Sequence, residues 1–212
     1  MILSKRLKAC ADMVRDGARL LDVGCDHGYV PVYLVKEGKV PSAVACDINE
    51  APLSSCRRLV ADYDLEDKIK CVLSDGFDSL DLSEADDILI AGLGGNLIED
   101  ILNRSDLEEL IDKHLIFCPA THPEKVKGWL YANTFEINKD FIVSDGDQYY
   151  NIIDAYYRGS LKEFSRTDLY LGKIEDFSEK EYFNRLIKYL KSKEKGGEDF
   201  SDIISDIEEK IK

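Results

Sequence analysis

An acidic residue and a glycine turn stand together early in this chain. The stretch LLDVGCDHGY at residues 20–29 begins as a buried strand and continues into a turn that holds two glycines. After a parallel strand, glycine lets the backbone pass close to a ligand, and the helix that follows offers free N–H groups. The stretch therefore predicts a binding site for a nucleoside cofactor.

The charge of this turn indicates which cofactor it binds. Asp22 and Asp26 would repel a pyrophosphate, whereas they would attract the ammonium and sulfonium groups of S-adenosylmethionine (SAM). The dinucleotide pattern G-x-G-x-x-G would also need glycine where Asp26 and Tyr29 stand. We therefore expect SAM rather than NAD, with Asp22, Gly24 and Asp26 among its ligands.

Two later strand-like runs also end in acids. Asp47 and Ile48 stand one βαβ crossover further along the chain than Asp22. At this position an acid can accept hydrogen bonds from both hydroxyls of a ribose. Asp75 and Gly76 follow the next run, where an acid can accept from the adenine amino group. One aspartate at a strand end is often only a helix cap or a turn residue. A series of aspartates at successive strand ends favours a cofactor site. We expect this site to include Asp47, Ile48, Asp75 and Gly76.

The fourth strand-like run ends in Gly92-Leu93-Gly94-Gly95, a turn with a single side chain. Such a turn beside the first strand allows a flat base to approach the cofactor methyl group. We expect Gly92 and Leu93 to contact the cofactor. Gly94 and Gly95, together with Tyr29, are expected to form a platform for the substrate base.

Strand-like and helical runs alternate over most of the chain. Strands are expected at residues 19–23, 42–47, 69–73, 87–91 and 115–118, with an N-terminal helix capped by Ser4 and a helix near residues 123–132. Two further strand-like runs, 137–143 and 149–157, are joined by an Asp-Gly turn that is typical of a hairpin. The pattern predicts an α/β, Rossmann-like, doubly wound sheet that ends in an antiparallel strand.

The character of the chain changes near residue 160. Apolar residues recur at helical spacing over residues 183–190, a Gly-Gly pair interrupts the pattern, and a second apolar stripe begins at Phe200. We expect two antiparallel, coiled-coil-like helices in a small C-terminal domain, residues 159–212. Residues 1–158 would then form the SAM-binding domain.

The composition is typical of a cytoplasmic enzyme. The chain has 212 residues with 44% hydrophobic content, enough for one buried core and an appendage. No apolar stretch approaches a membrane span, and the N-terminus has no secretory hydrophobic region. The six cysteines form no C-x-x-C pair and the three histidines are scattered. We therefore expect buried thiols in a reducing compartment, no metal site and no membrane partner.

The motifs together resemble one family. LSKRL at residues 3–7, DVGCDHGYVP at 22–31, DIN at 47–49, SDG at 74–76 and AGLGG at 91–95 are similar to the bacterial tRNA (adenine-22-N1)-methyltransferases. The resemblance covers about three quarters of the chain. It implies a class I methyltransferase fold with a seven-stranded sheet, SAM as the cofactor, Arg6 as a further cofactor ligand and tRNA as the substrate.

The implied reaction needs little acid–base chemistry. N1 of adenine carries a free in-plane lone pair, which can attack the sulfonium methyl before any proton is lost. Catalysis then consists of holding N1 in line with the methyl–sulfur bond and of stabilising the cationic product. We expect Asp26 to supply that stabilisation. His27 would stack on the base, move a proton or cap the helix that follows.

The formal net charge of −14 is unusual for a protein that binds RNA, because Lys and Arg drive phosphate binding. Basic side chains gather in two segments, residues 1–19 and 180–195. These segments are the expected RNA contacts, with Arg185 and Lys188 among them. For the second segment, a solvated helix face is the alternative interpretation.

Two other functions fit the same residues. A SAM-dependent methyltransferase of a small metabolite would need no basic surface, and a salt-dependent affinity for tRNA would argue against it. A non-catalytic SAM-binding module could use the C-terminal helices to recruit a partner, and it would bind SAM without turnover. We expect the protein to be a monomer or a weak dimer.

Overall fold

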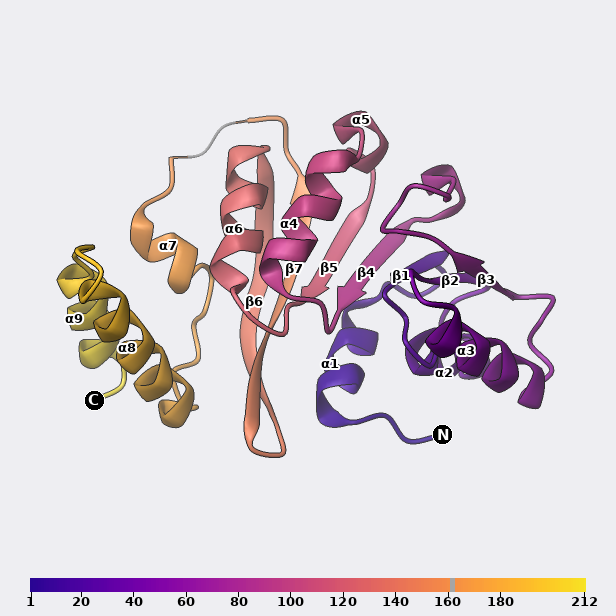
Figure 1. The fold of residues 1–212 in the computed structure, drawn as a ribbon, viewed down its shortest axis with the longest axis horizontal. Helices are drawn as coiled ribbons and strands as arrows, with labels where there is room; N and C mark the ends of the chain where they lie inside the picture. Colours follow the sequence, from indigo (N-terminus) through magenta and orange to yellow (C-terminus); the bar gives the residue numbers. More distant parts are fainter. Residues whose placement is uncertain (161–162) are drawn as a thin grey trace.

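The computed structural model describes residues 1–160 and 163–212. Its strands are β1 Leu20–Val23, β2 Ala43–Asp47, β3 Ile69–Leu73, β4 Asp87–Ala91, β5 His114–Cys118, β6 Phe135–Asp145 and β7 Gln148–Tyr157. They form one sheet in the order β3-β2-β1-β4-β5-β7-β6 (Figure 1). The strands from β3 to β5 are parallel, whereas β7 is antiparallel to both of its neighbours. The predicted sheet with a reversed strand is confirmed.

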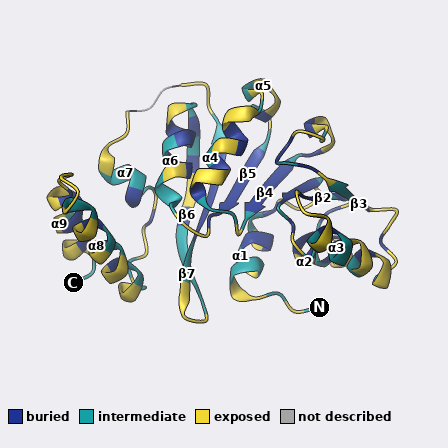
Figure 2. Cartoon of the chain, viewed as in Figure 1, coloured by how far each residue is buried: buried dark blue, intermediate teal, exposed yellow. Residues whose placement is uncertain are grey.

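Helices cover both faces of this sheet. They are α1 Lys5–Met13, α2 Tyr29–Lys36, α3 Glu50–Asp62, α4 Gly95–Arg104, α5 Leu107–Leu110, α6 Pro123–Ala132, α7 Arg166–Tyr170, α8 Lys180–Glu194 and α9 Ser201–Lys210, with a short 3-10 turn at Leu82–Glu84. Successive strand side chains point to opposite faces, so Leu89 packs in a core with α1, α2 and α3, while Ile88 packs in a core with α4 and α6. The central strands are accordingly buried (Figure 2).

Local sequence signals set several element boundaries. The Ser4 hydroxyl caps α1 by accepting from the N–H of Leu7 at 3.4 Å. Gly146 has a φ of +62° and lies in the two-residue loop between β6 and β7. Because a short hairpin loop needs positive φ, the Asp-Gly pair predicts this hairpin correctly. The hairpin is long, and its tip extends past the ends of the other strands (Figure 1).

The C-terminal helices pack around a core of their own. Phe183 and Leu190 of α8 meet Ile203 and Ile207 of α9 in it. The two predicted helices and the Gly-Gly break between them are confirmed. The sequence did not predict the short helix α7, whose five residues are too few to show a helical period.

A buried ion pair fixes this helical unit against the sheet. Lys127 of α6 is fully buried, pairs with Asp140 of β6 and donates to the Tyr170 carbonyl at 3.2 Å. A Cβ at Gly172 would come within 2.3 Å of the Asp140 carboxylate, so only glycine fits there. The chain after α7 therefore closes over a buried charge pair between α6 and β6.

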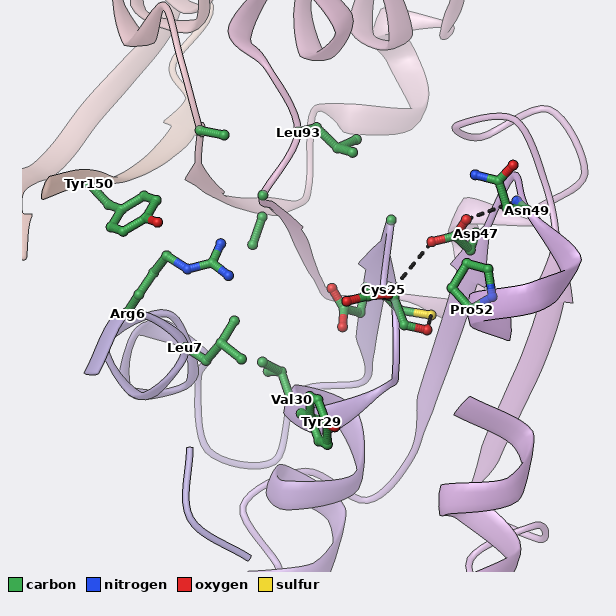
Figure 3. A pocket seen from close by; sticks show the side chains of 16 residues that line it. Arg6, Leu7, Cys25, Tyr29, Val30, Asp47, Asn49, Pro52, Leu93 and Tyr150 are labelled. Carbon is green, nitrogen blue, oxygen red and sulfur yellow. Dashed lines mark hydrogen bonds between the residues drawn. The ribbon is translucent and has the colours of Figure 1, made fainter. Parts of the chain in front are cut away.

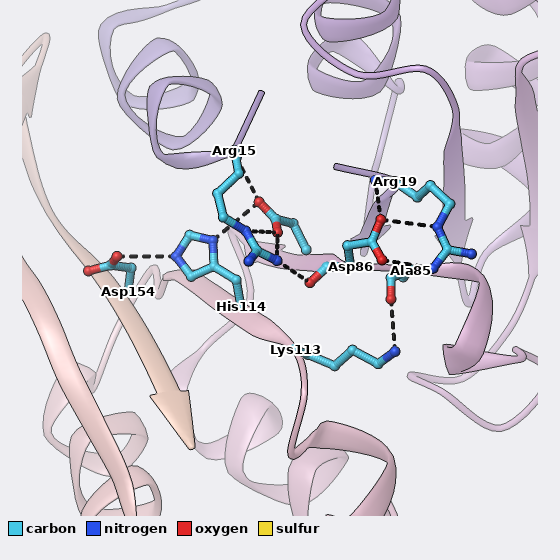
Figure 4. Close-up of polar contacts among 8 residues, drawn as sticks. Arg15, Arg19, Ala85, Asp86, Lys113, His114 and Asp154 are labelled. Carbon is cyan, nitrogen blue, oxygen red and sulfur yellow. Dashed lines mark hydrogen bonds and ion pairs between the residues drawn. The ribbon is translucent and has the colours of Figure 1, made fainter. Parts of the chain in front are cut away.

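A polar network joins the amino ends of the central strands (Figure 4). His114 Nδ1 lies 3.2 Å from Asp87 of β4, and His114 Nε2 lies 3.1 Å from Asp154 of β7. Burial alone would lower the pKa of His114, but the hydrogen bonds to the two carboxylates raise it above its ordinary value. The network therefore stabilises the sheet. It lies at the edge opposite the carboxyl ends of the parallel strands.

Two arginines of the basic N-terminal segment contribute to this edge. Arg15 Nε donates to Asp87 at 2.7 Å, and Arg19 pairs with Asp86 at 2.7 Å (Figure 4). Both carboxylates belong to the start of β4 or the residue before it. The sequence predicted RNA contacts for this segment, and the structure gives these two arginines a role in holding the sheet.

The cysteines are free, and all of them are buried except Cys71, which is half-buried. Within residues 1–160 and 163–212, no cluster of three or more His, Cys, Asp and Glu side chains is placed to hold a metal ion. None of the described helices is both long enough and apolar enough to cross a membrane.

Candidate functional site

A cavity of about 460 Å³ opens where β1, β2 and β4 end (Figure 3). Helix α1 and the β6–β7 hairpin contribute to its walls. Many of the residues that the sequence predicted for the site line it, namely Arg6, Asp22, Gly24, Asp26, Tyr29, Asp47, Gly92 and Leu93. The carboxyl ends of parallel strands share one edge of a sheet, which is why residues from distant parts of the chain meet here.

Asp22 is the buried acid of this cavity. It lies in β1 with 4% of its surface exposed. Burial, and then the charge of Asp47, raises the pKa of Asp22 to about 7. A cationic group bound beside Asp22 would offset both effects. A cation beside Asp22 would therefore favour the ionised form of this carboxyl.

Asp47 is the second acid, at the end of β2. Its Oδ1 accepts from the Asn49 N–H at 2.8 Å, and its Oδ2 accepts from the Asp26 N–H at 3.3 Å (Figure 3). These bonds orient the carboxylate and join the turns that follow β1 and β2. A carboxylate has about four acceptor positions, so lone pairs remain for the hydroxyls of a ligand.

Arg6 supplies positive charge at another wall of the cavity. Its guanidinium lies 4.9 Å from the centre of the Tyr150 ring (Figure 3), and the backbone N–H of Arg6 donates to the Asp145 carboxylate at 3.3 Å. A Cβ at Gly92 would come within 3.3 Å of this guanidinium. Arg6 is thus held against the backbone after β4, where it can bind an anionic group.

Glycine is required at two positions beside the cavity. Gly24 has a φ of +72°, and a Cβ there would press on the Leu93 side chain at 3.2 Å. Gly28 has the same φ, and a Cβ there would overlap the Cys56 thiol. The turn after β1 therefore keeps its course only with glycine at both positions.

Asp26 and Tyr29 lie at the rim of the cavity. Asp26 has a φ of +51°, and 70% of its side chain is exposed. His27 lies beside the cavity lining rather than in it, with its Nε2 3.6 Å from Asp26 Oδ1 and its ring 5.5 Å from the ring of Tyr29. Asp26, His27 and Tyr29 thus form an exposed polar and aromatic rim.

Three predicted cofactor residues lie outside the cavity lining. Ile48 is 58% exposed beyond Asp47. Asp75 and Gly76 follow β3, and Asp75 is paired with Arg104 of α4 at 2.8 Å. Arg104 also lowers the pKa of Asp75 by this hydrogen bond. The sequence could not indicate this partner, which is 29 residues away.

Gly94 and Gly95 also lie outside the lining. The Gly95 N–H donates to the Thr121 carbonyl at 2.7 Å, and a Cβ at Gly95 would come within 2.0 Å of the His122 carbonyl oxygen. Close packing of two loops therefore accounts for the glycine at position 95.

Arg185 and Lys188 lie on α8, away from this cavity. Arg185 Nη1 donates to the Asp147 carbonyl at 2.9 Å, and its Nε donates to Glu181 at 3.1 Å. Arg185 thus joins α8 to the tip of the hairpin, and Lys188 is exposed.

Sequence reasoning missed several lining residues. Tyr150 comes from the hairpin, Asn49 and Pro52 lie at the start of α3, and Ala120 follows β5. Asn49 and Pro52 could have been inferred because they directly follow Asp47. Tyr150 carried no such signal, since its position depends on how far the hairpin extends beyond β5.

Comparisons with known proteins show the class to which the chain belongs. A family model described as a methyltransferase domain matches residues 3–153. The tRNA (adenine(22)-N(1))-methyltransferase of Bacillus subtilis (strain 168) is 33% identical over 153 residues, which is 72% of this chain and 64% of that protein. The match in sequence therefore spans less than two thirds of that relative.

Solved structures extend the similarity. A Streptococcus pneumoniae protein solved in complex with S-adenosyl-L-methionine has a TM-score of 0.86 and 29% identity, covering 100% of each chain. The B. subtilis M1A22 tRNA methyltransferase has a TM-score of 0.81 and 25% identity, covering 99% of this chain and 96% of that chain. The C-terminal helices are thus part of the shared structure.

The strand order, the reversed strand β7 and the matching domain define the class I methyltransferase fold. Within this class, the similarity in sequence and in whole-chain structure points to one group. The chain belongs to the tRNA (adenine-22-N1)-methyltransferase family, as its motifs predicted.

Proposed function

We propose that this protein is a SAM-dependent methyltransferase that modifies N1 of adenine 22 in tRNA. The observation that carries this proposal is the buried carboxyl of Asp22, which faces a cavity between Asp47 and Arg6. SAM carries a cationic sulfonium and ammonium, an anionic carboxylate and a ribose diol. The three charged side chains can pair with these groups.

Each side chain has a distinct role in this proposal. Asp22 pairs with the ammonium of the methionine part, Arg6 pairs with its carboxylate, and Asp47 accepts from the ribose hydroxyls. Asp75 accepts from the adenine amino group with the lone pairs that Arg104 leaves available. SAM, when bound, supplies the methyl group on a positively charged sulfur.

The rim residues act on the substrate base. Asp26 stabilises the positive charge that develops on adenine as N1 is methylated. Tyr29 offers a ring on which an unstacked adenine can lie, and His27 orients that ring from the side. A base taken from a folded RNA loses its own stacking, which costs a few kcal/mol, so an aromatic platform at the rim favours this reaction.

The tRNA substrate and the cytoplasmic location form part of the proposal. The B. subtilis relative is by its name a tRNA methyltransferase, and tRNA is handled in the cytoplasm. Lys188 is exposed on α8, and half of the Arg185 side chain is exposed, so both can meet phosphate. The protein is expected to act as a monomer or a weak dimer.

The test is methyl transfer from labelled SAM to unmodified bacterial tRNA, followed by analysis of the nucleosides. The proposal expects label in 1-methyladenosine and none with an Asp47→Ala variant. SAM binding without transfer of label to any tRNA would reject this proposal and leave its two alternatives, a methyltransferase of a small metabolite and a non-catalytic SAM-binding module.

A further inference from the structure

Two adjacent tyrosines of β7 face two different cavities. Tyr150 lines the cavity described above, and Tyr149 lines a second cleft of about 450 Å³. Neighbouring residues on a strand point to opposite sides, which explains why one strand serves both cavities. Ala120, in the loop after β5, lines both of them. The second cleft therefore lies next to the candidate cofactor site, with Ala120 between the two.

The second cleft lies between the methyltransferase domain and the C-terminal helices. Its rings come from both parts of the chain: His122 precedes α6, Tyr149 belongs to β7, and Tyr182 and Tyr189 belong to α8. The rings of Tyr149 and Tyr182 lie 6.2 Å apart, and those of His122 and Tyr189 lie 6.3 Å apart. The cleft thus offers several aromatic faces around one space.

The hydrogen bonds at the back of the cleft keep these rings in place. The Tyr182 hydroxyl donates to Asn151 at 2.8 Å, and the Tyr189 hydroxyl donates to Glu124 at 3.2 Å. Both bonds join α8 to the first domain. These fixed contacts hold α8 in place on one side of the cleft, and the loop between β5 and α6 forms part of the other side.

A positive charge stands beside the aromatic faces. The Arg185 guanidinium lies 5.1 Å from the centre of the Tyr149 ring, donates to the Asp147 carbonyl at 2.9 Å and pairs with Glu181 at 3.1 Å. About half of the Arg185 side chain remains exposed. Aromatic faces next to an exposed arginine suit a flat base attached to a phosphate.

We propose that this cleft binds an unstacked nucleotide of the RNA substrate, a neighbour of the base that is methylated. The inference rests on the proposed function for the identity of the RNA. Tyr149 stacks on the base, and Arg185 meets its phosphate. A second bound base would help to keep the RNA open, so that the target adenine stays in the cofactor cavity.

The inference is tested with the full-length protein and unmodified tRNA transcript that contains 5-iodouridine. Irradiation should join the RNA to Tyr149 or Tyr189, and mass spectrometry identifies the residue. In parallel, Tyr149→Ala should weaken tRNA binding by at least about fivefold, because stacking contributes roughly 1–3 kcal/mol per base. Tyr149→Phe keeps the ring and should bind within about twofold of the wild type.

Tyr63→Ala, at the end of α3, is the matched control and should bind tRNA normally. SAM affinity should stay unchanged in every variant, which reports that the fold is intact. Cross-links at other residues only, or wild-type tRNA affinity in Tyr149→Ala, would overturn the inference even if methylation occurs. Cross-links in the cleft without methylation would support the second nucleotide site and reject the proposed function. If neither cross-links in the cleft nor methylation is observed, the nucleotide site and the proposed function are both rejected.

Discussion

Asp22 and Asp47 lie on neighbouring parallel strands, and their carboxyl groups line one cavity. Asp47 is held by two backbone N–H groups, whereas Asp22 is buried in β1. Burial and the charge of Asp47 together raise the pKa of Asp22 to about 7. The free protein therefore holds a carboxyl whose charge changes near neutral pH, at the position where a cation is expected to bind.

SAM affinity should accordingly rise with pH through neutrality. The ammonium of SAM pairs with the ionised form of Asp22, and a group with a pKa of about 7 is mostly protonated at pH 6. We expect the Kd to be about eightfold higher at pH 6.0 than at pH 7.5. Calorimetry on the wild type and on Asp22→Asn measures this, and the variant should show no such change. An equal pH dependence in both proteins would remove Asp22 from this role.

Asp22→Asn should stabilise the protein in the absence of SAM. An acid whose pKa is raised by folding keeps its proton longer in the folded state, so wild-type stability falls as pH rises from about 4 to about 7. Asparagine does not ionise, so the variant lacks this pH-dependent loss of stability. Its advantage in the free energy of unfolding should grow by about 2–3 kcal/mol between pH 5 and pH 8. Urea unfolding at the two pH values measures the difference, and a constant advantage would contradict the expectation.

Asp47→Ala should weaken SAM binding by at least about 100-fold, because two charge-assisted hydrogen bonds to the ribose are lost. Asp75→Ala is the matched comparison, since Asp75 also follows a strand but is paired with Arg104. It should weaken SAM binding by about tenfold. Calorimetry with circular dichroism as a folding control distinguishes them. Unchanged affinity in Asp75→Ala would exclude its contact with adenine.

Asp26→Asn should keep SAM binding and slow methyl transfer by at least about tenfold, which corresponds to roughly 1.4 kcal/mol of transition-state stabilisation. Asparagine tolerates the left-handed backbone that Asp26 adopts, so the turn should survive the change. Single-turnover rates at saturating SAM measure the effect. If binding and transfer fall equally, Asp26 is a cofactor ligand only.

The sequence predicted the acids that gather at one edge of the sheet because each lies at or near the end of a strand-like run. Asp22 and Asp47 needed no knowledge of tertiary structure beyond the rule that parallel strands end together. Contacts between segments that are distant in the chain could not be predicted from the sequence. The ion pair of Asp75 with Arg104 and the stacking of Tyr150 on Arg6 depend on how helices and the hairpin pack.

The same limit applies to glycines and basic residues. Gly95 was predicted to approach the substrate, and the sequence did not indicate that its missing side chain makes room for the His122 carbonyl. Arg15 and Arg19 were counted as RNA contacts, and they pair with acids at the opposite edge of the sheet. Residue type indicates which contacts are possible, whereas packing decides which of them form.

The most direct test of the account compares two unmodified transcripts of one tRNA, which differ only in having adenine or guanine at position 22. Each is incubated with the protein and labelled SAM, and the position of the methyl group is mapped. The account predicts 1-methyladenosine at position 22 of the first transcript and no transfer to the second. Equal labelling of both transcripts, or a methyl group at another position, would contradict it.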